Sequence, residues 1–181
     1  MAQIDLTGPV TDVARRLLGA ILWSEIDGEI TMVRLTEVEA YGGADDPASH
    51  AHRGRTERNA SMFATAGTLY TYRSYGIHTC ANVATGGRGE GSAVLFRAGE
   101  PVSGPEVMAR RRGRTDHLVD GPGKLCQALG IGLDHDGVDL LDPDSPIRLV
   151  AGEPAASVEA TPRIGISRAM DRHWRFMACE A

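Results

Sequence analysis

Hydrophobic and polar positions divide the chain into short elements. The apolar side chains of residues 13–18, VARRLL, share one side, which predicts a short helix with Thr11 as its N-cap. Residues 20–24 and 30–41 are largely apolar and predict two strands, and the Asp27–Gly28 pair between them predicts a tight hairpin. The chain therefore begins with a helix followed by a two-stranded unit.

The second of these strands carries acidic side chains among apolar ones. Strict alternation would place five side chains on one face: Val33, Leu35, Glu37, Glu39 and Tyr41. A carboxylate on a mostly apolar face is unfavourable unless it is paired, and desolvation raises its pKa and makes it a better base. Glu39 or Glu37 is thus a candidate general base. The alternative is a carboxylate at a strand end that is paired with an arginine.

A polar loop follows from residue 42 to residue 66. Long loops with few apolar residues are usually functional or mobile. The histidines of His50–Ala51–His52, together with His78, invite a metal-site interpretation, but neither HExxH nor CxxC is present. Histidines that bond backbone or substrate are the commoner case, so we expect no metal and no other cofactor.

The next segment predicts a hairpin with an aromatic tip. Alternation in residues 68–73 puts Tyr70 and Tyr72 on one face, and residues 74–77, SYGI, form the expected turn before a return strand. Tyr75 would then project from the tip. A single exposed aromatic is ordinary, but beside an arginine-rich loop it suits a wedge inserted between stacked bases.

Two later segments carry arginines in different settings. Residues 92–98, SAVLFRA, predict a buried strand whose Arg97 requires a carboxylate partner or a substrate anion. Residues 105–112, PEVMARRR, predict a helix that starts at a proline and ends in three arginines. Those arginines suit the helix dipole and equally suit phosphate contacts.

The C-terminal third predicts another anion-binding feature. Residues 120–130, DGPGKLCQALG, indicate a glycine-led helix with Lys124 in its first turn, and backbone amides at such a helix start bind anions. From Thr161 we expect a short strand, a polar connection and a final strand with Trp174 and Phe176.

Length and composition limit the architecture and the setting. A chain of 181 residues with 42% hydrophobic content forms one sizeable core, so we expect a single α+β domain over residues 1–181. Three widely spaced cysteines fit buried thiols in a reducing compartment. Without an apolar signal region or a membrane-length apolar run, we expect a cytoplasmic protein.

Charge is unevenly distributed along the chain. The formal net charge of −5 argues against nucleic-acid binding if it is taken alone. Residues 53–114 hold ten arginines and four glutamates, a local +6, whereas the rest of the chain carries −11. The basic segment could face phosphates or simply form a solvated surface.

Several long segments resemble the alkyladenine (3-methyladenine, methylpurine) DNA glycosylases of mammals and many bacteria. The matching segments cover nearly the whole chain in order: TEVEAYGG, DPASHAHRGRTERNASMF, GTLYTYRSYGIHTCANV, AVLFRAGEP, DGPGKLCQALGI and TPRIGISRAMDRHWRF. The resemblance implies a compact fold with a curved, mostly antiparallel sheet, flanking helices and a protruding hairpin that enters the DNA minor groove. It implies a bacterial, nucleoid-associated enzyme that acts as a monomer on double-stranded DNA containing damaged purines, without metal or cofactor.

The resemblance also assigns roles to residues of this chain. Glu39 matches the general base that activates water, and Arg97 matches the arginine that positions that water. The substrate-binding matches are Tyr41, His50, Tyr72 and Asn82, of which Asn82 lies on the pocket floor and discriminates against the amino group of guanine. Tyr75 matches the side chain that fills the gap left in the duplex, and Arg53, Arg55 and Lys124 are expected to contact the DNA backbone.

The resemblance implies removal of alkylated or deaminated purines by cleavage of the N-glycosidic bond, and the chain itself bears on whether the strand is also cut. Glycosylases that also cut the strand need an amine nucleophile, and the chain has one lysine, Lys124. A monofunctional mechanism that uses water is therefore favoured. Two alternatives remain: a non-catalytic nucleic-acid-binding domain using the same hairpin, and a metal-dependent hydrolase built on the histidines.

Overall fold

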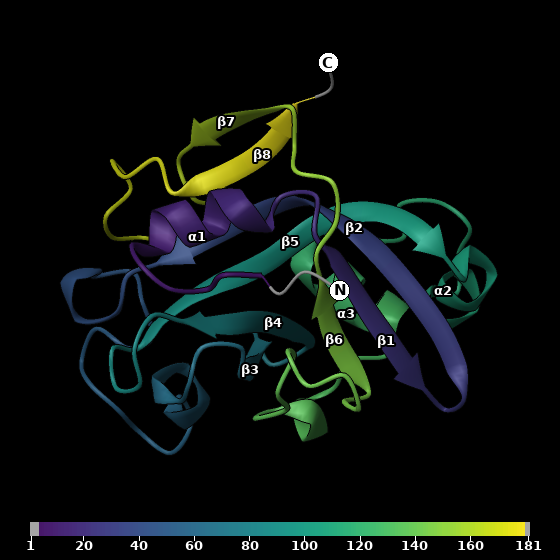
Figure 1. The fold of residues 1–181 in the computed structure, drawn as a ribbon, viewed down its shortest axis with the longest axis horizontal. Helices are drawn as coiled ribbons and strands as arrows, with labels where there is room; N and C mark the ends of the chain where they lie inside the picture. Colours follow the sequence, from purple (N-terminus) through teal and green to yellow (C-terminus); the bar gives the residue numbers. More distant parts are fainter. Residues whose placement is uncertain (1–3, 180–181) are drawn as a thin grey trace.

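The computed structural model describes residues 4–179 as one eight-stranded antiparallel sheet with α-helices packed against it (Figure 1). This is the expected α+β class. The helices are α1 (Val10–Leu17), α2 (Pro105–Arg112) and α3 (Pro122–Leu129), with 3-10 turns at Gly43–Asp45, Ala60–Phe63 and Leu133–His135. The strands are β1 (Ile21–Ile26), β2 (Glu29–Tyr41), β3 (Leu69–Ser74), β4 (His78–Thr85), β5 (Ser92–Ser103), β6 (Ile147–Val150), β7 (Ser157–Thr161) and β8 (Arg175–Cys179).

The sheet forks at its longest strand, β2. The main order is β3-β4-β5-β2-β1-β6, and β5 pairs with β2 along nearly its whole length. On the other edge of β2, residues 29–34 pair with β1 and residues 37–39 pair with β8, which in turn pairs with β7. Figure 1 shows the β7–β8 hairpin beside α1, apart from β1 and β6. The C-terminal segment is thereby fixed to the middle of the sheet.

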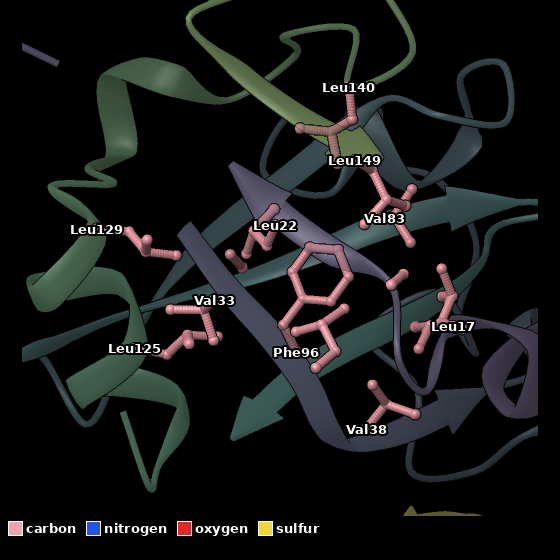
Figure 2. Packing of buried hydrophobic residues seen from close by; sticks show 14 of the residues in the cluster. Leu17, Leu22, Val33, Val38, Val83, Phe96, Leu125, Leu129, Leu140 and Leu149 are labelled. Atoms are coloured by element: carbon pink, nitrogen blue, oxygen red, sulfur yellow. The ribbon is translucent and has the colours of Figure 1, made fainter. Parts of the chain in front are cut away.

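One large apolar core lies between the sheet and the helices. The Phe96 side chain lies at its centre with Leu22, Val33 and Val38 around it (Figure 2). Helix α1 contributes Leu17 from one side, and α3 contributes Leu125 and Leu129 from the other. Full burial of one such side chain stabilises the fold by roughly 1.5–3 kcal/mol, so this core holds the sheet against the helices.

The helix boundaries follow proline and glycine positions. The N-cap prediction for Thr11 is wrong, because α1 starts earlier: Pro9 is the N-cap residue and its carbonyl accepts from the Asp12 and Val13 amides. Pro9 already has φ −54°, which suits a helix start. Helix α3 starts at Pro122 and ends at Gly130, whose φ of 74° is the left-handed conformation expected of a terminating glycine.

The face predicted for β2 is also wrong in part. Val33 and Leu35 face the core, but the next core residues are Val38 and Ala40, so the inward face changes from odd to even positions. The change lies where the pairing with β5 becomes irregular, on either side of Glu37. This β-bulge directs Glu37, Glu39 and Tyr41 away from the core. Simple alternation cannot anticipate such an inserted irregularity.

Other boundaries agree with expectation or shift slightly. Asp27 and Gly28 both have positive φ, 57° and 74°, as the predicted hairpin requires. At Thr161 the predicted short strand is misplaced, because β7 ends there and a connection from 162 to 174 follows. Cys80 and Cys126 are buried free thiols, whereas Cys179 is half-buried. Within residues 4–179, no helix has the length and hydrophobicity needed to cross a membrane.

Candidate active site

A cavity of about 650 Å³ lies on the side of β2 and β5 that faces away from the main core. Its walls come from the β3–β4 hairpin, the loop at 47–53 and the connection at 164–168. The structure thus brings eight of the ten predicted site residues to one cavity: Glu39, Tyr41, His50, Arg53, Tyr72, Tyr75, Asn82 and Arg97. Arg55 and Lys124 do not line it.

Glu39 lies at the base of this cavity with none of its side chain exposed to solvent. Its Oε1 accepts a hydrogen bond from the backbone amide of Ile164 at 2.7 Å and lies 3.4 Å from Nη1 of Arg97. Its Oε2 accepts from the hydroxyl of Tyr41 at 2.8 Å. Because a carboxylate has about four acceptor positions, these three groups leave one for a further donor such as water.

Glu37 forms a separate cluster beside Glu39. Its Oε1 accepts from Nε of Arg97 at 2.9 Å and from Nε of Arg175 at 2.6 Å. Burial alone would raise the pKa of Glu37, but the bonds from Arg175 and Arg97 outweigh it and hold that pKa below its usual value. Arg97 therefore bridges the two glutamates. For Glu37, the structure supports the arginine-paired alternative.

Three aromatic rings form one wall of the cavity. Tyr70 and Tyr72 stack at 5.7 Å between centroids, and His50 meets Tyr72 edge to face at 4.6 Å. His50 Nδ1 shares a 3.0 Å hydrogen bond with the Tyr70 hydroxyl. Burial, and secondarily the charge of Arg58, lowers the pKa of His50, which favours the neutral imidazole. This wall offers flat, uncharged surfaces to a planar ligand.

Tyr41 links the aromatic and acidic parts of the site. Burial and the neighbouring Glu39 charge raise the pKa of Tyr41, so its hydroxyl remains a neutral donor to Glu39. Asn82 is buried, and its Nδ2 donates to the Tyr70 carbonyl at 3.2 Å across the β3–β4 pair. Asn82 is thus held by the sheet at the cavity wall.

Tyr75 occupies the tip of the β3–β4 hairpin and is 85% exposed. Its φ of 50° is rare for a residue with a side chain, and Gly76 beside it also has a positive φ, 67°. The turn closes with the Ile77 amide donating to the Ser74 carbonyl at 3.1 Å. A large ring in a strained backbone position at the rim of a cavity suggests function rather than packing.

Besides Tyr70 on the aromatic wall, three contributions to the site were missed from the sequence. The backbone amide of Ile164 contacts Glu39, Arg175 contacts Glu37, and Arg163 pairs with Asp46 beside Tyr41. Every residue except proline has a backbone amide, so the identity of residue 164 does not indicate that its amide contacts Glu39. For the two arginines, the available signal was the density of arginines in the C-terminal connection, next to acidic strand and loop positions that needed partners.

The arginines of the basic stretch at 53–114 do not all line the cavity. The α2 arginines at 110, 111 and 112 bind protein groups, among them the side chains of Glu29 and Gln127 and the carbonyl of Ile26. Lys124 donates to Asp120 at 2.7 Å. Arg53 lines the cavity together with Arg168, which lies outside the basic stretch. In the described part of the chain, no three His, Cys, Asp or Glu side chains gather as a metal site.

Comparisons with known proteins show the family of the chain. A family model described as methylpurine-DNA glycosylase (MPG) matches residues 5–181. A Nocardia farcinica protein named "Putative 3-methyladenine DNA glycosylase" is 52% identical, with 97% of this chain and 87% of the relative covered. A Mycolicibacterium fortuitum protein of the same name is 50% identical, with 93% and 88% covered. The chain therefore belongs to the methylpurine-DNA glycosylase family and is an enzyme of the DNA glycosylase type.

Proposed function

We propose that the enzyme removes alkylated or deaminated purines from double-stranded DNA by flipping the damaged nucleotide into the 650 Å³ cavity. The observation that supports this proposal most directly is the environment of Glu39. Its carboxylate is fully buried at the base of an aromatic cavity and has one remaining acceptor position. A base inside a duplex shields its glycosidic bond, so the nucleotide must leave the stack, at a cost of a few kcal/mol that is lowest for damaged or mispaired bases.

The reaction we propose is a hydrolysis at C1′ of the flipped nucleotide. A water oxygen bonds to C1′ as the bond from C1′ to N9 breaks, and the bonding electrons leave with the purine. Glu39 takes the proton from that water, and Arg97, 3.4 Å from Glu39, holds the charge and position of the carboxylate. The products are the released purine and an abasic sugar.

Substrate binding in this proposal relies on the rings. Stacking on an aromatic face is worth about 1–3 kcal/mol per base, and Tyr72, His50 and Tyr41 supply such faces. A purine made cationic by N-alkylation gains a further cation–π attraction. Tyr75 fills the gap in the duplex and offsets part of the flipping cost.

Strand cleavage does not belong to the proposed reaction. The one lysine of the chain, Lys124, is absent from the cavity lining and is paired with Asp120. Without a lysine beside C1′, the Schiff-base route has no side-chain amine among the residues around the cavity. Water is then the nucleophile.

The test is Glu39→Gln, measured as single-turnover base release from duplex DNA carrying 3-methyladenine, 7-methylguanine, hypoxanthine or ethenoadenine. We expect at least a ~100-fold fall in rate, the usual contribution of a general base, with affinity for abasic DNA largely retained. Glu37→Gln is the matched comparison, because it removes the same charge two residues away while its amide oxygen can still accept from Arg97; its fall in rate should be at least ~10-fold smaller than that of Glu39→Gln.

Two results would overturn the proposal in different ways. An equal fall in Glu37→Gln and Glu39→Gln would remove the special role of Glu39. No base release by the unmodified enzyme from any of the four lesions would instead favour the non-catalytic DNA-binding alternative.

A further inference from the structure

A buried ion pair lies behind the cavity, between the loop after β2 and the C-terminal connection. Arg163 donates to Asp46 through Nη1 at 2.5 Å and through Nη2 at 2.8 Å, and both side chains are fully buried. Asp46 also accepts from the Gly42 and Ala48 amides at 3.1 and 3.2 Å. One carboxylate therefore fixes both its own loop and the start of the connection.

Arg163 reaches the cavity through the ring of Tyr41. Its guanidinium carbon lies 4.7 Å from the centre of that ring, and Nη1 donates to the Ala40 carbonyl at 2.9 Å. The same guanidinium carbon lies 5.2 Å from the ring centre of Trp174. The cation therefore supports Tyr41, whose hydroxyl bonds Glu39.

Arg163 also reaches Glu39 through the backbone. Ile164, the next residue, donates its amide to Oε1 of Glu39 at 2.7 Å. Ile164 is 50% exposed and is not part of the core. What keeps this amide beside Glu39 is then the anchoring of residue 163, one peptide unit away.

We infer that Arg163 is a positioning residue for catalysis, which uses its ion pair with Asp46 to hold two of the hydrogen-bond donors of Glu39, the Ile164 amide and the Tyr41 hydroxyl. This inference rests on the proposed role of Glu39. The Nε–H of Arg163 is buried without an acceptor among the described residues, so the placement of the guanidinium follows the carboxylate and the rings rather than full hydrogen bonding.

The variant that tests this inference is Arg163→Lys. Lysine keeps the positive charge but loses the two-pronged geometry that fits both oxygens of Asp46. We expect the maximal single-turnover rate on hypoxanthine-containing duplex to fall about 10–100-fold, while the DNA concentration for half-maximal rate stays within about twofold. Arg172→Lys is the matched control, and its rate should stay within about twofold of the unmodified enzyme. Arg172 stacks on Trp174 at 4.7 Å and lies 3.8 Å from Asp46, but it is not among the residues that contact Tyr41 or Glu39.

A double variant distinguishes a positioning role of Arg163 from a general contribution of Arg163 to the stability of the fold. If Arg163 acts through Glu39, Arg163→Lys should lose most of its effect when combined with Glu39→Gln, because the two changes remove one shared function. An effect of equal size in both backgrounds would overturn the inference. So would a folded Arg163→Lys enzyme whose rate stays within about twofold of the unmodified enzyme.

A backbone substitution keeps the test usable if Arg163→Lys does not fold. Replacing residue 164 by the corresponding α-hydroxy acid turns its amide into an ester and removes only the N–H, with the Asp46–Arg163 pair intact. We expect a rate loss of at least about fivefold, and an unchanged rate would overturn the inference. Base release by the unmodified enzyme, measured in parallel, shows separately whether the proposed function itself holds.

Discussion

The two faces of the β2–β5 pair differ in what holds their side chains. On the core face, Val33, Leu35, Val38 and Phe96 pack by shape and apolar area alone. On the cavity face, Glu37, Glu39, Tyr41 and Arg97 are held by directed contacts of 2.6–3.4 Å. The same two strands thus carry a core that tolerates volume-conserving exchange and a site that depends on particular atoms.

This difference depends on the irregularity beside Glu37. Without it, alternation would continue and Glu37 and Glu39 would follow Leu35 into the core, where unpaired carboxylates are unfavourable. With it, the strands keep burying apolar residues while their neighbours turn to the cavity. A bulge next to a site is common because it re-aims side chains. The two faces are therefore separable in experiment.

Leu22→Ala should give the largest change in stability and leave the site alone. Leu22 is fully buried on β1 and does not line the cavity. A buried leucine changed to alanine costs about 2–5 kcal/mol of unfolding free energy. Urea unfolding should show that loss, while the base-release rate per folded molecule stays within about twofold. A rate loss larger than the folded fraction explains would show that the faces are coupled.

Lowering the pH should destabilise the protein through two carboxylates near the cavity, those of Glu37 and Asp46. The pKa values of Glu37 and Asp46 lie below their ordinary values because bonds from arginines outweigh burial. Their stabilisation is therefore complete above the unfolded pKa values near 4 and is lost as pH falls toward the folded ones. Each contributes a slope of at most about 1.4 kcal/mol per pH unit.

The measurement is the unfolding free energy between pH 3 and pH 6. The slope should be smaller in Asp46→Asn than in the unmodified protein. Asp116→Asn is the control: Arg114 also lowers the pKa of Asp116, but solvent screens this fully exposed ion pair, so the slope should stay close to that of the unmodified protein. An unchanged slope in Asp46→Asn would mean that the acid response arises elsewhere.

Tyr75→Asn should give the smallest change in stability, and with the opposite sign. Asparagine tolerates positive φ, and Asn-Gly is the preferred pair for such a turn, so we expect a gain of up to about 1 kcal/mol. Base release should fall more for stably paired lesions than for mispaired ones, because the wedge is gone. Equal losses on both would count against the wedge role, and a loss of stability would count against backbone strain at Tyr75.

Much of the fold was predictable because its signals are local. The Asp27–Gly28 hairpin, the β3–β4 hairpin with Tyr75 at its tip, and the α3 helix closed by Gly130 were all predicted. Each depends on residues adjacent in sequence, so tertiary contacts did not need to be known. The start of α1 was misjudged because Thr11 resembles a cap while Pro9 already sets the backbone.

The sequence predicted the site residues whose side chains have proposed chemical roles, but not the residues that hold them in place. Resemblance to a family pointed to Glu39, Arg97 and the aromatic residues, and the structure gathers them at one cavity. The supporting contacts come from far along the chain: Asp46 bonds Arg163, 117 residues later, and Glu39 bonds Ile164, 125 residues later. No local pattern encodes such pairs, because only the packing of β8 against β2 brings them together.

The order in which the chain is synthesised has a consequence for these contacts between distant residues. Glu39 and Arg97 leave the ribosome well before Ile164 and Arg175, which complete the bonds around the two glutamates. A nascent chain that stops before residue 164 lacks these donors to the acidic residues. We therefore expect base release only from chains that include Ile164 and Arg175 and in which β8 has docked on β2.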